Sequence, residues 1–270
     1  MESHTVEVRG VPLRWMIQGS GAPVVLIHGI PTSPALWRHV APLVEDVRLL
    51  AFEMVGYGES IPAGRERDLS VAHQADYLLA GLDALEIDRA VLVGHDLGGG
   101  VAQIAAVREP DRCAGLVLTN AIAYDSWPIP SVKVLRATAP ALRRLPARTA
   151  QAVMGTLFAR GHDDAAMARE SLRVHARPYL DHDGAAALAR QVSWLHVHDT
   201  LAVGDRLREL DVPARVVWGA ADQFQKVAYG QRLAWDLRCD LDRIDGGKHF
   251  VPEDHPDRIA DAIHAVARAA

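Results

Sequence analysis

Short, wholly apolar runs alternate along the chain with stretches whose apolar residues recur every three or four positions. The first pattern predicts strands buried on both faces of a sheet, and the second predicts amphipathic helices. Ser70–Leu85 is the clearest helix, because Val71, Ala75, Leu78 and Leu82 fall on one stripe. Apolar strands are expected at Pro23–Ile27, Val47–Phe52, Ala90–Val93, Gly115–Thr119, Ala214–Trp218 and Leu241–Ile244.

Two further strands, Thr5–Arg9 and Leu13–Gln18, are expected before these, paired across Gly10-Val11-Pro12. Strands that alternate with helices predict an α/β fold, here a mostly parallel eight-stranded sheet with helices on both faces. We also expect a short helix that runs through Trp37 to Leu43, and a closing helix capped by Asp254.

The alternation stops between the fourth and fifth apolar runs. Residues 124–208 hold helical pieces interrupted by proline and glycine, yet apolar residues persist throughout. This pattern predicts a helical cap inserted into a core domain made of residues 1–123 and 209–270.

Composition narrows the class of protein. The chain has 270 residues, and its hydrophobic content of 49% is ordinary for a globular protein. Its formal net charge of -5 gives no reason to expect nucleic acid or an anionic membrane as partner. Two cysteines are too few for a disulfide framework. No leader segment and no apolar run of about 20 residues is present, so we expect a cytoplasmic protein. As partner we expect a small-molecule, mainly apolar substrate. The sequence does not determine the oligomeric state.

The segment Gly94-His95-Asp96-Leu97-Gly98 joins a buried strand to a helix. A turn this tight strains its central residue and requires small neighbours, which is the arrangement of the nucleophile elbow G-x-S-x-G with aspartate in place of serine. A carboxylate at this position can attack carbon without first losing a proton. The alternative is a glycine-rich turn in which Asp96 merely caps the helix.

Other polar candidates follow other strands of the predicted sheet. In an open parallel sheet, ligands bind beyond the carboxyl ends of the strands. Asp222 follows the strand Ala214–Trp218, and His249 follows the last strand. The order Asp96, Asp222, His249 is that of the nucleophile, acid and histidine of an α/β-hydrolase. Asp222 could instead be a turn residue and His249 a solvated one, and Asp125, at the start of the insertion, is a rival for the acid.

These motifs together resemble the α/β-hydrolases with a helical cap, in the aspartate-nucleophile branch of epoxide hydrolases and haloalkane dehalogenases. The resemblance spans most of the chain but does not cover the cap residue by residue. The residues that carry it are His28-Gly29-Ile30-Pro31-Thr32-Ser33, Leu36-Trp37-Arg38, Gly56-Tyr57-Gly58-Glu59-Ser60, Gly94-His95-Asp96-Leu97-Gly98-Gly99, Trp218-Gly219-Ala220-Ala221-Asp222 and His249-Phe250.

The resemblance implies a hydrolase that needs no cofactor and no metal. Asp96 would attack a saturated carbon to give an alkyl ester, and His249, oriented by Asp222, would activate the water that hydrolyses it. The backbone N–H groups of Ile30 and Leu97 would form the oxyanion hole.

The leaving group separates the two chemistries. Haloalkane dehalogenases of this type hold the halide with a tryptophan after the nucleophile and often an asparagine after the His-Gly pair, where this chain has Leu97 and Ile30. An epoxide hydrolase needs an acidic donor in the cap, and Tyr179, His175 and Trp194 are the candidates for that substrate-binding role. We therefore expect epoxide opening, with two alternatives: a dehalogenase with an atypical halide site, or a non-hydrolytic cyclase or lyase.

Overall fold

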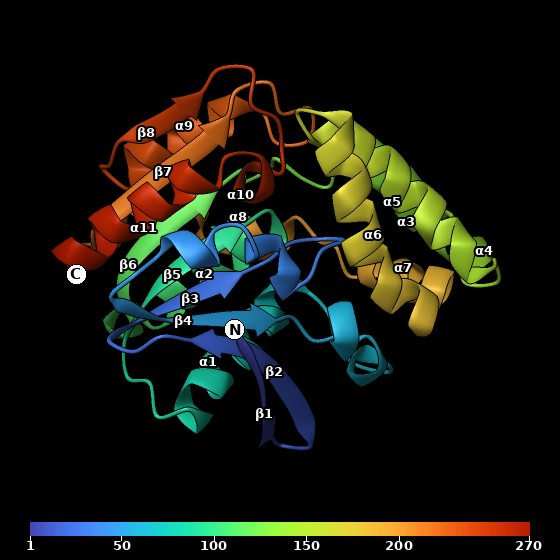
Figure 1. Cartoon of the computed structure of the whole chain (residues 1–270), viewed down its shortest axis with the longest axis horizontal. Coiled ribbons are helices and arrows are strands. Elements are labelled where there is room, and N and C mark those ends of the chain that lie inside the picture. Colours follow the sequence, from blue (N-terminus) through green and yellow to red (C-terminus); the bar gives the residue numbers. More distant parts are fainter.

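The computed structural model describes all 270 residues and contains one eight-stranded sheet (Figure 1). The strand order is β1-β2-β4-β3-β5-β6-β7-β8, with β1 and β2 antiparallel to their neighbours and every other pair parallel. The predicted α/β-hydrolase sheet is therefore confirmed. The strands are β1 (Glu2–Val8), β2 (Val11–Gln18), β3 (Ala22–Ile27), β4 (Val47–Glu53), β5 (Ala90–His95), β6 (Cys113–Thr119), β7 (Ala214–Gly219) and β8 (Leu241–Ile244).

Helices cover both faces of this sheet. Helix α2 (Leu97–Arg108) packs on β3, β5 and β6, with α1 (Val71–Ala84) and α8 (His198–Gly204) beside it. Helix α11 (Pro256–Ala269) packs on the same central strands and does not pack closely against α2, and so covers the opposite face. Because both faces are covered, β5 is buried along its whole length and directs its carboxyl end toward the cap.

All regular structure between β6 and β7 is helical. Figure 1 shows α3 to α7 gathered at one end of the sheet. These helices are α3 (Pro130–Ala137), α4 (Ala139–Leu142), α5 (Ala147–Gly161), α6 (Ala165–Asp181) and α7 (Gly184–Ser193). Helix α8 returns to the sheet and contacts α2. No helix combines the length and the apolar composition needed to cross a bilayer.

The structure corrects two expectations about helices. Residues 34–43 form two separate 3-10 turns, η1 (Pro34–Trp37) and η2 (Ala41–Leu43), because Pro42 has no N–H with which to continue a helix. The closing helix α11 begins at Pro256 with His255 as its N-cap, so Asp254 does not cap it. Asp254 instead ends α10 (Val251–Asp254), and its carboxylate binds His162 of the cap. The remaining elements are α9 (Val227–Asp236) and the 3-10 turns η3 (Gly58–Ser60), η4 (Pro62–Gly64), η5 (Pro110–Arg112) and η6 (Leu207–Glu209).

Candidate active site

Asp96 lies at the strained turn between β5 and α2. Its backbone has φ 51° and ψ −119°, a conformation that non-glycine residues rarely adopt. A side chain at Gly94 would meet the carbonyl of Gly98, and one at Gly98 would meet the carbonyl of Ile27. The carboxylate makes no capping hydrogen bond to α2, which argues against the helix-cap alternative. The turn therefore presents a carboxylate that does not cap α2 and that interacts with this helix only through the N–H of its first residue, Leu97.

The carboxylate of Asp96 is nearly enclosed. The backbone N–H of Ile30 donates a hydrogen bond to its Oδ2 at 3.0 Å. Burial raises the pKa of Asp96 to about 6, although the charge of His249 and the N–H groups of Ile30 and Leu97 oppose the rise. Asp96 is thus ionised at neutral pH but only weakly solvated, a state that favours attack on carbon.

His249 and Asp222 meet beside Asp96. The His249 Nδ1 donates to Asp222 Oδ2 at 2.8 Å. Asn120 Nδ2 donates to the same oxygen at 2.6 Å, and the Phe224 N–H donates to Asp222 Oδ1 at 2.7 Å. Burial alone would raise the pKa of Asp222, but His249 and these donors outweigh it and lower the pKa. Asp222 therefore stays ionised, and in turn it raises the pKa of the buried His249 imidazole.

Two residues of this region were not singled out from the sequence. Asn120 directly follows β6, and its Oδ1 also accepts from the Gly219 N–H, so it joins β6 to β7 beneath the acid. Burial lowers the pKa of His95 to about 3, and the neutral ring donates from Nε2 to the His249 carbonyl at 2.9 Å. A polar residue at the end of a buried strand was the available signal for Asn120, and membership of the elbow motif was the signal for His95.

Asp125, the rival acid, lies elsewhere. It is exposed, and its carboxylate accepts a hydrogen bond from the Tyr229 hydroxyl at 3.2 Å. It makes no contact with His249, so the geometry leaves Asp222 as the partner of the histidine.

An apolar cavity lies over Asp96 and His249. The volume of this cavity is about 70 Å³. Core and cap both contribute to its lining, and only four of the lining residues carry a polar group. The lining residues are Ile30, Pro31, Asp96, Leu97, Ile122, Trp127, Pro128, Ile129, Val132, Leu157, Leu195, Phe224, Gln225, His249 and Phe250.

The three cap residues expected to bind substrate lie outside this lining. Helix α6 continues through Pro178 and carries Tyr179. The Tyr179 hydroxyl donates to Gln191 Oε1 at 2.7 Å, and Gln191 Nε2 in turn donates to the Gly56 carbonyl. His175 contacts Glu253 and Ser33 instead of the cavity. The Trp194 ring packs edge-on against His196. The structure therefore does not bring these three side chains to the cavity over Asp96, because each is turned to partners elsewhere in the cap or in the core.

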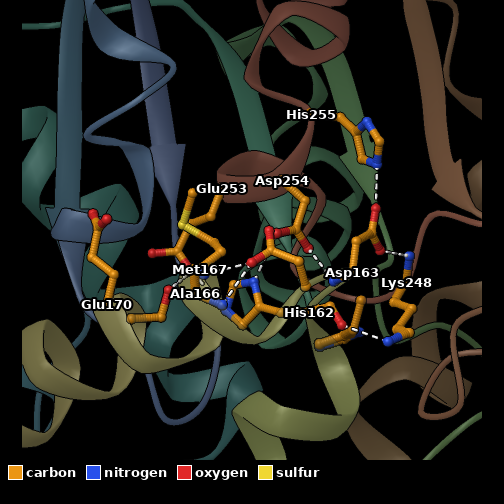
Figure 2. A network of polar contacts seen from close by, with 12 residues as sticks. His162, Asp163, Ala166, Met167, Glu170, Lys248, Glu253, Asp254 and His255 are labelled. Atoms are coloured by element: carbon orange, nitrogen blue, oxygen red, sulfur yellow. Dashed lines mark hydrogen bonds and ion pairs between the residues drawn. The ribbon is translucent and has the colours of Figure 1, made fainter.

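The side chain of Glu253 binds the cap to the core. It is fully buried, and it accepts from Ser171 Oγ at 2.6 Å and from His175 Nε2 at 3.1 Å. It also pairs with the guanidinium of Arg38 and, at 3.2 Å, with Nε2 of His162. We call these residues and Asp254 the cap–core cluster, part of which Figure 2 shows.

Within the cap–core cluster, His162 lies between two carboxylates (Figure 2). Its Nδ1 donates to Asp254 Oδ1 at 2.9 Å. Burial alone would lower the pKa of His162, but Asp254 and Glu253 raise it to about 9. The cluster thus holds a buried cation at the end of α5.

The end of α5 also holds the loop that carries His249. The Gly161 carbonyl accepts hydrogen bonds from the N–H groups of both His249 and Phe250, at 2.9 and 3.1 Å. The His162 ring stacks on Phe250, with ring centroids 4.6 Å apart. The position of His249 therefore depends on the cap as well as on the core. No group of three or more His, Cys, Asp or Glu side chains is arranged to hold a metal ion.

Comparison with known proteins agrees with this fold. A family model described as alpha/beta hydrolase fold matches residues 22–256. The chain belongs to this family. The α/β-hydrolase is similar to an uncharacterised hydrolase of Bacillus subtilis, with 27% identity over 89% of this chain and 88% of the relative. It is also similar to a haloalkane dehalogenase of Agrobacterium fabrum, with 27% identity over 98% and 91% of the two chains. A solved alpha/beta hydrolase fold protein from Burkholderia ambifaria has 27% identity and a TM-score of 0.89, over 96% of each chain.

The first prediction concerns the partner of His249. Asp222→Ala should lower kcat by about 10²–10⁴-fold, because the imidazole loses the group that orients it and favours its protonated form. Asp125→Ala is the matched control and should leave kcat close to wild type, since Asp125 is exposed and makes no hydrogen bond with His249. Steady-state kinetics of both variants checks the assignment, and the reverse order of effects would refute it.

The second prediction concerns the buried cation. A histidine whose pKa is raised on folding stabilises the folded state fully below its unfolded pKa of about 6.5, and this contribution disappears as the pH rises through the folded value. For His162 the loss should run from about pH 6.5 to about pH 9. The free energy of unfolding of His162→Gln should therefore lie furthest below that of the wild type in acid. The two values should converge at about pH 9. Urea titrations at several pH values measure this gap. His4→Gln, on exposed β1, should show little loss, and a gap that widens with pH would contradict the assignment.

Proposed function

We propose that this α/β-hydrolase displaces a halide from a saturated carbon by attack of the Asp96 carboxylate. The observation that carries the proposal is a buried, ionised carboxylate at the elbow that faces a cavity whose lining, apart from His249, offers no acidic side chain to a leaving group. A halide leaves as a weak base and needs no proton, whereas an epoxide oxygen leaves as an alkoxide and does.

The first step follows from the position of Asp96. One carboxylate oxygen forms a bond to the substrate carbon while the carbon–halogen bond breaks, and the halide departs with the bonding electron pair. The product is an ester between Asp96 and the alkyl group. No base is required, because the nucleophile is already ionised.

The second step uses His249 and Asp222. His249 takes a proton from water, and the resulting hydroxide attacks the carboxyl carbon of the Asp96 ester. The N–H of Ile30, which already donates to Asp96 Oδ2, would stabilise the negative charge on that oxygen together with the N–H of Leu97. The alcohol leaves, Asp96 is regenerated as a carboxylate, and Asp222 stabilises the imidazolium until its proton returns to solvent.

Epoxide opening, the expectation from the sequence, becomes the second candidate. It depended on a cap phenol directed at the reacting centre, and Tyr179 is instead bound to Gln191 outside the cavity. The similarity to a haloalkane dehalogenase along nearly the whole chain supports placing halide displacement first.

The third prediction tests the covalent step. His249→Gln should form the Asp96 ester in one stoichiometric burst and then stop, because attack by a carboxylate needs no base but hydrolysis of an ester does. Intact-mass spectrometry of this variant, offered a panel of haloalkanes and epoxides, should show an alkyl adduct that carries no halogen. Asp96→Ala should show none. An adduct from epoxides alone would replace the proposed substrate class, and an adduct that persists in Asp96→Ala would refute the nucleophile.

The fourth prediction concerns the pH dependence of the first step. A protonated carboxyl group is a poor nucleophile, so the rate of halide release in the burst should fall as the pH drops through the pKa of Asp96, about 6. The charge of His249 lowers this pKa, so His249→Gln should move the midpoint to higher pH. Stopped-flow measurement of halide release across this range gives both midpoints. A burst rate that does not change in acid would exclude Asp96 as the attacking group.

A further inference from the structure

The side chain of Gln225 makes no hydrogen bond that would stabilise the fold. Four residues along the cavity carry polar side chains, and Asp96 and His249 are assigned to the reaction. The third, Trp127, donates from Nε1 to Thr200 Oγ1 at 2.7 Å and is thereby occupied. The fourth, Gln225, is only 3% exposed: its Oε1 is fully buried without a partner, and its Nε2, the atom that can donate, makes no hydrogen bond within the chain.

A buried carboxamide without partners destabilises a folded protein, because its bonds to water are lost and not replaced. The backbone around it is well anchored: the Gln225 carbonyl accepts from Trp218 Nε1 at 3.0 Å, and the Phe224 N–H is bound to Asp222. The amide is thus held beside the triad acid with its own hydrogen-bonding capacity free. Tyr57 also has an unpaired, buried hydroxyl, but it does not line the cavity.

The chemistry of a carboxamide limits what it can bind. Its N–H groups donate hydrogen bonds, but at neutral pH they do not transfer a proton. Such a group stabilises an anion that remains an anion, such as a halide, and it cannot neutralise a forming alkoxide. Ile30 and Leu97 contribute no side-chain donor to the cavity, so Gln225 is the uncommitted side-chain donor available there.

We propose that the Gln225 carboxamide donates the side-chain hydrogen bond that stabilises the leaving halide, an inference that rests on the proposed function. As the carbon–halogen bond breaks, negative charge accumulates on the halogen, and the hydrogen bond from Gln225 strengthens with it. Because the donor lies after β7, next to the triad acid, the halide site is built from the core and not from the cap or the elbow.

The fifth prediction separates this role from a structural one. Gln225→Met retains the length of the side chain and removes the hydrogen bond, so its Tm should equal or exceed that of wild type, since an unsatisfied buried amide is lost. For chloroalkanes kcat/KM should fall by about 10- to 100-fold, the scale of a hydrogen bond to a charged group. Gln223→Met, two residues away and exposed, removes only the contact with Arg160 and is the matched control.

The leaving-group series gives a signature that a general packing defect would not produce. Chloride carries its charge on a smaller ion than iodide does, so loss of the donor should lower kcat/KM for chloroalkanes more than for matching iodoalkanes. An equal loss across the series would show that Gln225 contacts the rest of the substrate, and this would overturn the assignment. A marked drop in Tm with no change in kcat/KM would overturn it as well.

A binding measurement tests the site without turnover. Sodium bromide should quench the tryptophan fluorescence of the wild-type protein through Trp127, which lines the cavity. Gln225→Met should weaken bromide binding by about tenfold or more, while Gln223→Met should bind as wild type does. Absence of bromide binding to wild type, or equal binding to both variants, would refute the halide site. If bromide binds through Gln225 and no haloalkane reacts, the site stands and the proposed reaction fails.

Discussion

The difficulty of keeping a carboxylate charged among apolar groups governs the arrangement of this molecule. Water is the best solvent for an anion, and the cavity over Asp96 is lined mainly by hydrocarbon side chains. The protein replaces that water with the N–H of Ile30 at 3.0 Å, the N–H of Leu97 and the nearby His249. The replacement is incomplete, which is why the pKa of Asp96 rises, and in the proposed reaction it leaves the oxygen available to attack carbon.

The ionisable groups around Asp96 also depend on partners that offset their burial. Asp222 raises the pKa of His249 and so favours its protonated form, and Asn120 and the Phe224 N–H stabilise Asp222 in turn. On the other side of Phe250, His162 carries a positive charge balanced by Asp254 and Glu253. The charge of His162 also lowers the pKa of His249, in opposition to Asp222. The basicity of the histidine is therefore set by groups from both the core and the cap.

The sequence allowed the sheet and the central site to be predicted because both depend on local patterns. Apolar runs defined six of the eight strands, a pair of segments across Gly10-Val11-Pro12 gave the other two, and the elbow required glycine on both sides of Asp96. The cap could not be predicted in the same way. Tyr179 and His175 are four residues apart on α6, but the surface that this helix presents to the cavity depends on how it packs against residues far away in sequence. Asp254 shows the same limit, since its carboxylate binds a histidine 92 residues distant.

The attachment of the His249 loop to Gly161 divides the cap into a fixed part and a freer part. The end of α5 cannot shift without moving the catalytic loop, because one carbonyl holds two of that loop's N–H groups. Helix α3 has no fully buried residue, although Ile129 and Val132 at its start line the cavity. Over evolutionary time, the stretch around α3 can therefore acquire substitutions and insertions that reshape the pocket while the reaction centre is inherited unchanged. This asymmetry offers a physical route by which one ancestral enzyme could give rise to descendants with different substrates.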